Sequence, residues 1–455
     1  MARQVLLLLA ALAVCSGLEI RRPALGFNTW NAFYRDINET LVQQQANLMV
    51  SLGLRDVGFE YLVLDDCWAE KERPADGRLV GNKRTFPSGM KAMGEYIKGR
   101  GLKFGIYSDA GSLTCAKYPG SLGYEKEDAD TFASWGVDYL KYDNCHARRD
   151  YWILDRYAAM RDALNATGRP IVYSLCQWGV MEAHLWGPKM GHSWRTTEDI
   201  RPTWDSVLKT LDYNVGLSRF AGSDVGWLDL DMLYVGNDTG LRLGEQRAHF
   251  ALWSLYKSPL MIGHDLRDFP KQSLSILLSK EVIAVNQDDL GVPGDLIWRQ
   301  GHKRIYAGPL AGGARAVVLA NFQFAHPTAF QQCPRTNITV FWGQIGLQPG
   351  QRARVRDLYE ERDLGEFVDS FTGSVEAHNV LALRVTPLNG PLDDGWRPWH
   401  GQPAYAAQAA NVAVQRYEDW VPKSAPWRCM KAGGGDTVFQ QPDPAKQPGC
   451  GGKDR

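Results

Sequence analysis

Several common signatures of metal and nucleotide chemistry are missing from this sequence. It has no C-x-x-C pair and no H-E-x-x-H string, so neither zinc-binding pattern occurs. No glycine-rich G-x-G-x-x-G turn follows a predicted strand, which disfavours an open dinucleotide-binding sheet. The 51 basic and 51 acidic residues cancel, so no net field attracts nucleic acid or an anionic membrane. We therefore predict no metal site and no nucleic-acid partner, and expect a neutral substrate.

The sequence also lacks an apolar run long enough to cross a bilayer. Its longest unbroken run, residues 5–14, is about half the length that a span requires. This run follows Arg3 and precedes the small residues Ser16 and Gly17, which is the pattern of a cleaved export signal. We predict a signal peptide over residues 1–17, no membrane span, and a secretory route to the extracellular space or to a vacuole or lysosome.

Four N-x-T sequons agree with export, and each predicts a glycosylation site. They lie at Asn38, Asn165, Asn237 and Asn337. The chain has eight cysteines, of which Cys15 leaves with the predicted signal peptide. The seven that remain are an odd number, so at least one thiol is free or pairs with another chain.

Between residue 24 and about residue 290, short β-like runs alternate with helical stretches. The helical face formed by Ile153, Tyr157, Met160 and Leu164 is one example. Apolar strands without strict alternation, separated by helices, indicate a parallel sheet buried on both faces. Eight such units match a (β/α)8 TIM barrel, predicted over residues 18–293, with an open doubly wound sheet as the alternative. The β-like runs lie at residues 24–30, 59–66, 102–110, 137–144, 170–176, 192–199, 219–224 and 259–265.

The pattern changes after Pro293. The segments there are short and β-rich, and Gly, Pro and charged turns separate them. Large apolar residues alternate with smaller or charged ones over residues 381–385, the period of a half-buried strand. We predict an antiparallel β-sandwich domain over residues 294–388. Residues 389–455 are a tail rich in Pro, Gly and Trp, for which the sequence suggests no function, and no oligomeric state is predicted.

Side chains capable of chemistry gather at the ends of the predicted strands. In a β/α barrel the active site lies at the C-terminal strand ends, so these side chains should meet at one face. A carboxylate on a buried strand end costs desolvation unless it is paired, and a scaffold does not require so many. The side chains at these ends and in the loops that follow are Trp30, Asp65, Asp66, Tyr107, Asp109, Lys141, Asp143, Cys176, Trp178, Arg195, Asp199 and Asp231.

Each of these residues also has a purely structural interpretation. The acidic pair at 65–66 could cap the following helix. Lys141 and Asp143 lie on one face of a strand and could form a structural ion pair. Arg195 and Asp199 could stabilise a loop. The convergence of all of them at one barrel face, together with two tryptophans, favours a sugar-binding site.

The residue types suit glycoside cleavage, which needs two carboxyl groups flanking an oxocarbenium-like centre. The Lys141 ammonium group would favour the ionised form of Asp143, which suits Asp143 as nucleophile. Asp199 is the candidate general acid that later acts as base, with Arg195 orienting polar oxygens. The acidic pair at 65–66 offers acceptors to neighbouring sugar hydroxyls.

Six strings follow one another through the chain: LGFNTWNAF, YLVLDDCWAE, FGIYSDAGSLTC, DYLKYDNC, SWRTTEDI and GWLDLDMLYVGN. In this order they resemble the α-galactosidases of glycoside hydrolase family 27, especially the plant-type members, over residues 21–388. The resemblance implies a (β/α)8 barrel followed by an antiparallel β-sandwich domain. It also implies a retaining double displacement that uses no metal and no organic cofactor.

The resemblance further implies roles for single residues. Asp143 in KYDNC matches the nucleophile, and Asp199 in RTTED matches the acid/base. Cys115 and Cys145 match a disulfide that braces the site, and Cys115 also lines it. The positions that match galactose-binding residues are Trp30, Asp65, Asp66, Tyr107, Lys141, Arg195, Asp231 and Met232.

The fifth strand separates substrates within the family. Members that accept N-acetylgalactosamine have small residues there, whereas Cys176 and Trp178 resemble the plant α-galactosidase pattern. The indole would fill the space that an acetamido group needs, so we expect a galactose-containing carbohydrate as the binding partner. The alternatives are an α-N-acetylgalactosaminidase, a β-L-arabinopyranosidase and a non-catalytic galactose-binding homologue.

The sequence departs from the family pattern in three places, and two of them, Gln177 and the altered loop at 223–230, support the non-catalytic alternative. Gln177 stands where Glu is usual, and Arg35 stands where a Cys usually pairs with Cys67, which is therefore the candidate free thiol. The usual PGGWNDPDM string becomes SDVGWLDLDM, with Leu228 and Leu230 in place of Asn and Pro. Retention of both candidate catalytic carboxylates opposes that alternative, because binding alone does not require the pair.

Overall fold

The structure is a computed structural model. It describes residues 20–147, 153–236, 240–323, 335–390 and 395–398, and the backbone of 430–431 and 437–438. The predicted signal peptide, the sequon at Asn237 and most of the predicted tail lie outside the described residues.

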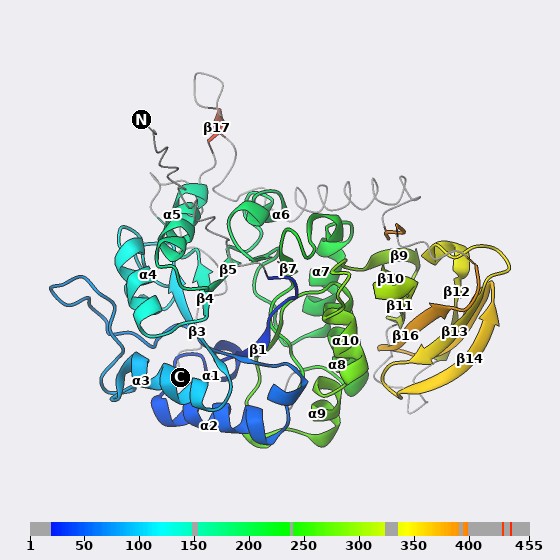
Figure 1. Cartoon of the computed structure of the whole chain (residues 1–455), viewed down its shortest axis with the longest axis horizontal. Helices are drawn as coiled ribbons and strands as arrows, with labels where there is room; N and C mark the ends of the chain where they lie inside the picture. Colours follow the sequence, from blue (N-terminus) through cyan, green and yellow to red (C-terminus); the bar gives the residue numbers. More distant parts are fainter. Residues whose placement is uncertain are drawn as a thin grey trace, which may run out of the picture.

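Eight parallel strands curl into a barrel (Figure 1). The predicted (β/α)8 barrel is confirmed, because every neighbouring pair in this sheet is parallel. The segment after the seventh strand closes the remaining seam, where Leu233 forms a parallel bridge with Ile262. The strands are β1 (Leu25–Asn28), β2 (Tyr61–Leu64), β3 (Lys103–Asp109), β4 (Tyr139–Asp143), β5 (Val172–Cys176), β6 (Ser193–Arg195), β7 (Trp227–Asp229) and β8 (Leu260–Ile262).

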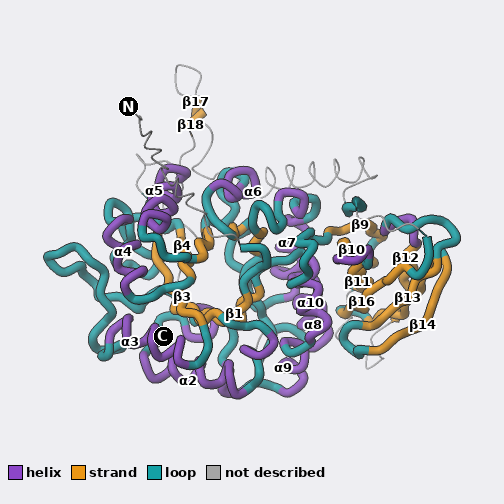
Figure 2. Tube along the Cα trace, in the orientation of Figure 1, coloured by secondary structure: helices purple, strands orange, loops and turns teal. Residues whose placement is uncertain are grey.

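Helices surround this sheet (Figure 2). The predicted apolar face of the fifth helix is confirmed, since Ile153, Tyr157, Met160 and Leu164 are all buried. The α-helices are α1 (Trp30–Phe33), α2 (Glu39–Ser51), α3 (Gly89–Gly99), α4 (Glu125–Ser134), α5 (Ile153–Ala166), α6 (Ala183–Trp186), α7 (Trp204–Asn214), α8 (Leu243–Leu255), α9 (Lys271–Leu277) and α10 (Lys280–Asn286). Short 3-10 helices are η1 (Arg55–Val57), η2 (Gly187–Lys189), η3 (Ser218–Phe220), η4 (Leu266–Asp268), η5 (Ala311–Gly313) and η6 (Trp342–Ile345).

The seventh strand lies later in the chain than the sequence predicted. The β-like run at 219–224 is wrong, because Ser218–Phe220 form η3 and the strand begins at Trp227. A tight turn joins Gly222 to Gly226, and both glycines have positive φ angles, 156° and 110°. A Cβ atom at Gly226 would lie 2.7 Å from the carbonyl oxygen of His192, so the turn depends on glycine there.

The second domain is an antiparallel β-sandwich, as predicted. One sheet has six strands in the order β14-β13-β16-β11-β10-β9, and β12 pairs with β15 in the other. The two sheets bury an apolar core that includes Val317, Ile338 and Leu383. The strands are β9 (Asp295–Gln300), β10 (Lys303–Pro309), β11 (Arg315–Asn321), β12 (Arg335–Phe341), β13 (Arg352–Asp357), β14 (Arg362–Val368), β15 (Ser370–Glu376) and β16 (Asn379–Pro387), followed by the isolated pair β17 (Met430–Lys431) and β18 (Thr437–Val438).

The sandwich packs against the side of the barrel that carries α8 and α10 (Figure 1). Asp295 at the start of β9 is buried and accepts hydrogen bonds from Tyr256 and from the backbone of Gly216. Arg356 pairs with Glu281 of α10 at 2.6 Å. These polar contacts fix the orientation of the two domains.

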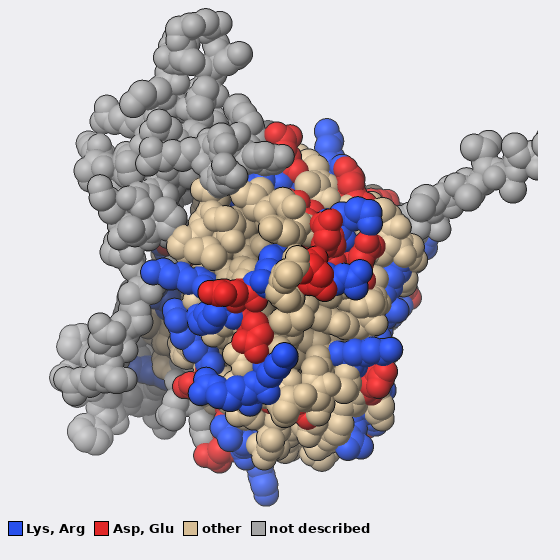
Figure 3. Space-filling view, turned by 90° about the vertical axis from the view of Figure 1, so that its left-hand side faces the viewer, with Lys and Arg blue, Asp and Glu red and all other residues tan. Residues whose placement is uncertain are grey.

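The surface agrees with the balanced charge of the sequence. On the face in Figure 3, Lys and Arg side chains lie among Asp and Glu side chains rather than forming one field. The described sequon residues Asn38, Asn165 and Asn337 are exposed, which is compatible with their predicted glycosylation. Within the described part of the chain, no helix has the length and apolar character needed to cross a membrane.

Candidate active site

Most of the predicted site residues lie at the C-terminal ends of the barrel strands. Trp30 begins α1 just after β1, the acidic pair at 65–66 follows β2, and Asp231 follows β7. One pocket at these ends contains five of the predicted residues together with six others. Its lining residues are Asn28, Val63, Tyr139, Lys141, Ser174, Cys176, Arg195, Asp229, Asp231, Met232 and Met261.

Asp143, at the end of β4, is held in place by hydrogen bonds to both carboxylate oxygens. Its Oδ2 accepts from the Tyr107 hydroxyl at 3.1 Å, and its Oδ1 accepts from the backbone N–H of Asn144 at 2.9 Å. Burial raises the pKa of Asp143 to about 7, the Lys141 ammonium group lowers it, and the charge of Asp199 raises it. A carboxyl group fixed in this way can present one oxygen to an electrophilic carbon.

Lys141 forms a different ion pair from the one with Asp143 that the spacing along its strand suggests. Its Nζ donates to Asp65 Oδ2 at 2.7 Å, so the local structural pair with Asp143 is wrong. The same Asp65 oxygen accepts from Asn28 Nδ2 at 2.7 Å. Although burial disfavours its charge, the carboxylates, with Asp65 first, raise the pKa of Lys141 well above its ordinary value. Lys141 therefore acts on Asp143 through space as a permanent cation.

Arg195 joins two carboxylates on the other side of the site. Its Nη2 lies 2.8 Å from Asp231 and 3.2 Å from Asp199. The Asp231 side chain is 5% exposed, whereas that of Asp199 is 66% exposed. One carboxylate is therefore buried within the site, and the other stands at the rim, open to solvent.

Asp231 keeps a defined position although the preceding loop departs from the family pattern. Its backbone φ is +75°, which is unusual for a residue other than glycine. Its Oδ2 accepts from the N–H of Ile200 and its Oδ1 from that of Met232, each at 2.7 Å. The Trp253 indole donates to its carbonyl oxygen at 2.7 Å. Together these hydrogen bonds hold Asp231 in an unfavourable backbone conformation. They therefore keep its carboxylate next to Arg195.

Asp66 does not cap a helix, because the next helix, α3, begins only at Gly89. Its Oδ1 accepts from the Cys67 N–H at 2.7 Å, and its Oδ2 accepts from the Ala116 N–H at 2.8 Å. Burial raises its pKa to about 6. The helix-capping interpretation of Asp66 is therefore wrong. Asp66 instead connects the loop after β3 to the end of β2.

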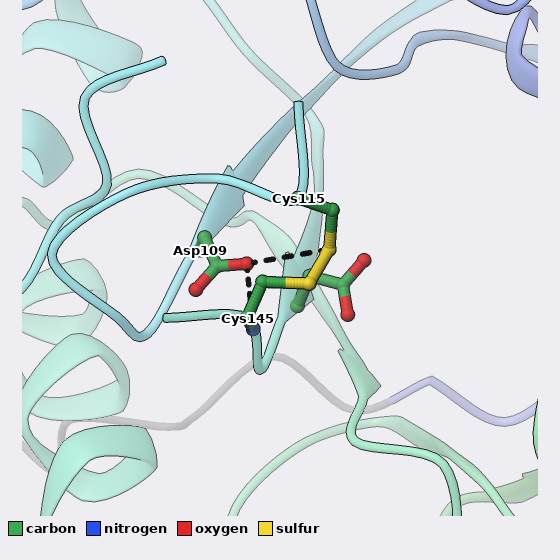
Figure 4. A group of neighbouring side chains, drawn as sticks. Asp109, Cys115 and Cys145 are labelled. Atoms are coloured by element: carbon green, nitrogen blue, oxygen red, sulfur yellow. Dashed lines mark hydrogen bonds between the residues drawn. A yellow bond between two sulfur atoms is a disulfide. The ribbon is translucent and has the colours of Figure 1, made fainter. Parts of the chain in front are cut away.

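The predicted disulfide between Cys115 and Cys145 is confirmed, and it brackets the site (Figure 4). The Tyr107 hydroxyl lies 3.4 Å from the Cys115 sulfur. Asp109 lies beside the bridge and accepts from the N–H groups of Gly111 at 2.6 Å and Cys145 at 2.9 Å. The bridge and Asp109 together join the loop after β3 to the end of β4.

A metal could be sought in this cluster, because ligand atoms of Asp109, Cys115, Asp143 and Cys145 all lie within 4.8 Å of one another. The two sulfurs are joined to each other, however, so neither is available as a thiolate ligand. The remaining carboxylates are a poor donor set, so the cluster does not fit a resident metal.

Two further carboxyl groups lie at the site: Asp109, which was placed at a strand end but given no role, and Asp229, which was not among the predicted residues. Burial, and then the charge of Asp143, raise the pKa of Asp109 well above its ordinary value. Asp229 lines the pocket and accepts from the Asp231 N–H at 2.8 Å, and burial raises its pKa to about 6. Both stand in the strings SDAG and WLDLDM, two residues from a predicted site residue, so strand alternation was an available signal.

Gln177 is fully buried, and both ends of its amide are occupied. Its Nε2 donates to the Arg195 carbonyl at 3.0 Å, and its Oε1 accepts from the Gly179 N–H at 2.6 Å. The residue therefore braces the loops after β5 and β6. Trp178 is half-buried with a φ of +61°, and the Cys176 thiol lies 3.6 Å from Arg195 Nη1.

Cys67 is a free thiol, as predicted from Arg35 in the place of its usual partner. Among the described cysteines, Cys176 is also free. Burial raises the pKa of Cys67 to about 12, and the charge of Asp66 raises it further while Arg35 lowers it. A buried thiol with such a pKa is inert at neutral pH.

Comparisons with known proteins agree with this architecture. The family profile described as alpha galactosidase A matches residues 26–288, and that described as the alpha galactosidase C-terminal beta sandwich domain matches residues 300–385. Alpha-galactosidase 3 of Arabidopsis thaliana is 46% identical over 81% of this chain and 82% of its own length. An alpha-galactosidase of Oryza sativa is 44% identical, over 81% and 85% respectively. Among solved structures, alpha-galactosidase I of Mortierella vinacea matches with a TM-score of 0.75 and 35% identity, over 81% of this chain and 98% of its own.

Proposed function

The chain belongs to the α-galactosidases of glycoside hydrolase family 27, retaining enzymes that hydrolyse terminal α-linked galactose, and we propose that Asp143 and Asp199 perform its two displacement steps. In the first step, an Asp143 oxygen bonds to the anomeric carbon as the bond to the leaving oxygen breaks. Asp199 gives that oxygen a proton. In the second step, water attacks the galactosyl–Asp143 ester and Asp199 takes the proton of the water. The product is α-galactose, because two inversions restore the configuration.

One observation carries this assignment of roles: the two carboxyl groups have opposite environments. Asp143 is buried and fixed by Tyr107 and by its neighbour's backbone, as a nucleophile requires. Asp199 is open to solvent and anchored by Arg195 on one oxygen only. It can therefore reach a leaving oxygen, release the departing alcohol and then meet water, without being displaced from the site.

The remaining predicted residues fit the binding of one galactose ring. We propose that the carboxylates of Asp65 and Asp231 accept hydrogen bonds from sugar hydroxyls, because both lie at the strand ends beside fixed cations. The half-exposed indole of Trp30 would cover an apolar face of the ring. Asp66, Tyr107, Cys115, Lys141, Arg195 and Met232 would complete the wall of the same site.

The substrate preference follows from the end of β5. Trp178 stands two residues after Cys176, which lines the pocket, and its indole is large compared with the small side chains expected in family members that accept N-acetylgalactosamine. We propose that the indole excludes an acetamido group at C2, so that terminal galactose is preferred. The natural galactoside could belong to an oligosaccharide or to a glycoconjugate.

Azide rescue tests the two roles separately. Asp143→Gly should abolish hydrolysis of nitrophenyl α-galactoside, and azide should restore release of nitrophenol with β-galactosyl azide as product. Asp199→Gly should accept azide on the covalent intermediate and form α-galactosyl azide instead. Failure of azide to give these opposite anomers would contradict the assignment. Full activity of Asp143→Gly without azide would contradict the nucleophile.

We also propose that the protein is exported, on the basis of residues 1–17 and the four sequons. A eukaryotic secretory host expressing the full chain should release active enzyme into the medium or into a vacuolar compartment. The released protein should lose apparent mass on treatment with a peptide N-glycosidase. Retention in the cytosol, or an unchanged mass, would contradict export or glycosylation respectively.

A further inference from the structure

The position of Asp199 restricts where the leaving group lies. This inference rests on the proposed function, in which Asp199 protonates the oxygen of the bond that breaks. Because the Asp199 side chain is 66% exposed, that oxygen lies at the boundary between the buried pocket and solvent. The group that is linked to galactose must therefore extend outward over the rim of the pocket. There it meets side chains that have no part in binding the galactose ring.

Tyr34 is the large exposed aromatic residue nearest in sequence to the predicted sugar-binding Trp30. It follows α1 directly, and its backbone N–H donates to the Trp30 carbonyl at 2.7 Å. Its ring stands edge-on to the Trp30 ring, with centroids 5.7 Å apart and an interplanar angle of 72°. The Tyr34 residue is 57% exposed, so more than half of its surface is open to solvent beside the predicted sugar-binding tryptophan.

The backbone at Tyr34 is strained, with φ +49° and ψ −113°. A bulky residue seldom adopts such angles, and glycine or asparagine would avoid most of the cost. Core packing does not account for a tyrosine here, because more than half of its surface faces solvent. The strain instead keeps an aromatic ring at the mouth of the barrel, directly after the first site residue.

A buried tyrosine links Tyr34 to the catalytic side of the mouth. Tyr234 is 7% exposed, and its hydroxyl donates to the carbonyl of Ile200, the neighbour of Asp199, at 3.4 Å. Burial raises the pKa of Tyr234, and the charges of Asp231, Tyr34 and Asp199 raise it in addition. Tyr34 and Asp199 thus both act electrostatically on this one hydroxyl group.

We propose that Tyr34 forms a subsite for the leaving group, in which its exposed ring stacks against the pyranose ring that is linked to galactose. An aromatic face suits the C–H face of a neutral sugar, and the contact with the Trp30 ring holds the Tyr34 ring in place at the mouth of the barrel. The subsite takes a neutral glycosyl leaving group such as glucose or another hexose. It contributes to substrate choice and does not take part in the bond-breaking steps.

The test compares two substrates that differ only beyond the galactose ring. Melibiose has a glucose leaving group, whereas α-galactosyl fluoride has no ring at that position. Tyr34→Ala should lower kcat/KM for melibiose by about 3- to 10-fold, the range expected for the loss of one aromatic stacking contact. The same variant should keep kcat/KM for the fluoride, and Ki for free galactose, within about twofold of the wild type.

Two further variants separate stacking from other roles. Tyr34→Phe retains the ring and should match the wild type on both substrates. Phe341→Ala removes a ring that is 56% exposed in the β-sandwich domain, and it should change neither substrate. Equal losses on melibiose and on the fluoride would overturn the proposal, because they would indicate a structural role for Tyr34. Unchanged melibiose hydrolysis by Tyr34→Ala would overturn it as well. A wild-type enzyme that hydrolyses neither substrate would contradict the α-galactosidase function itself.

Discussion

The ammonium group of Lys141 contacts Asp65, a residue 76 positions earlier in the chain, at 2.7 Å. Asp143, only two positions later on the same strand, has Tyr107 as its nearest side-chain donor instead. Asp65 therefore fixes the cation, and the field of that cation acts on Asp143, the proposed nucleophile. A substitution at Lys141 can therefore change the pKa of Asp143 without removing a hydrogen bond that Asp143 itself accepts.

The first prediction concerns the acid limb of the pH profile. Asp143 must be ionised to attack, and its pKa is about 7, so the acid limb of the kcat/KM profile should be centred near that value. Lys141 lowers this pKa, so Lys141→Gln should move the limb to higher pH and reduce kcat/KM roughly tenfold or more at pH 5. Asp65→Asn removes a charge that raises the pKa and should move the limb the opposite way. Shifts in the same direction for both variants would contradict this account.

The second prediction concerns Gln177, which stands where the family usually has Glu. Gln177→Glu replaces the amide donor that meets the Arg195 carbonyl with a carboxylate oxygen. The unfolding free energy at pH 7 should fall by about 1–3 kcal/mol, the cost of leaving a buried acceptor unpaired. At pH 4 to 5 a protonated Glu can donate again, so the loss should shrink. Urea unfolding at the two pH values measures the difference, and equal losses would count against the explanation.

The third prediction concerns Asp295 at the domain boundary. Burial raises its folded-state pKa to about 6, above the unfolded value of about 3.9. The fold therefore favours the protonated form, and this stabilisation is complete below about pH 4 and is lost as the pH rises through about 6. Asp295→Asn does not titrate, so its cost in unfolding free energy should be larger at pH 4 than at pH 7 by about 2–3 kcal/mol. Denaturant midpoints at both pH values provide the measurement. A cost that does not change with pH would refute the assignment.

The fourth prediction concerns the disulfide between Cys115 and Cys145, which lies beside the proposed nucleophile Asp143. Cys115 and Cys145 are separated by 30 residues, so removing the bridge should cost roughly 3–4 kcal/mol through the unfolded chain. The double variant Cys115→Ser with Cys145→Ser should show that loss in denaturant unfolding, together with reduced kcat. Cys67→Ser removes a buried thiol but no crosslink and serves as the control. A double variant as stable as this control would contradict the prediction.

The fifth prediction concerns the choice between galactose and its N-acetyl derivative. Trp178→Ala, combined with Cys176→Ser, should open space at the end of β5. The ratio of kcat/KM for nitrophenyl α-N-acetylgalactosaminide to that for nitrophenyl α-galactoside should rise tenfold or more, because removal of a steric clash exceeds the worth of one methylene. The wild-type enzyme should favour galactoside. Preference of the wild type for the acetamido substrate would show that the indole does not exclude it.

Much of the fold could be predicted because its signals are local. Apolar runs without alternation marked seven of the eight barrel strands, and the alternation near residue 383 marked β16. The seventh strand was missed because the segment predicted at 219–224 includes Gly222, which forms a turn with Gly226, and the strand begins only after that turn. Periodicity alone does not show which of two neighbouring segments pairs with β6, since that choice depends on the sheet.

The candidate site, like the fold, has features that the sequence predicts and features that depend on the tertiary structure. The sequence by itself determined which residue types stand at each strand end, because the order of strands and loops is written in the chain and parallel strands must end at one face. Only the tertiary structure decided the partners: Lys141 with Asp65, Asp66 with the Ala116 backbone, and Gln177 with the Arg195 carbonyl. Those contacts depend on how the strands are staggered around the barrel and on where each loop turns back, and neither is encoded in the spacing of residues along one strand.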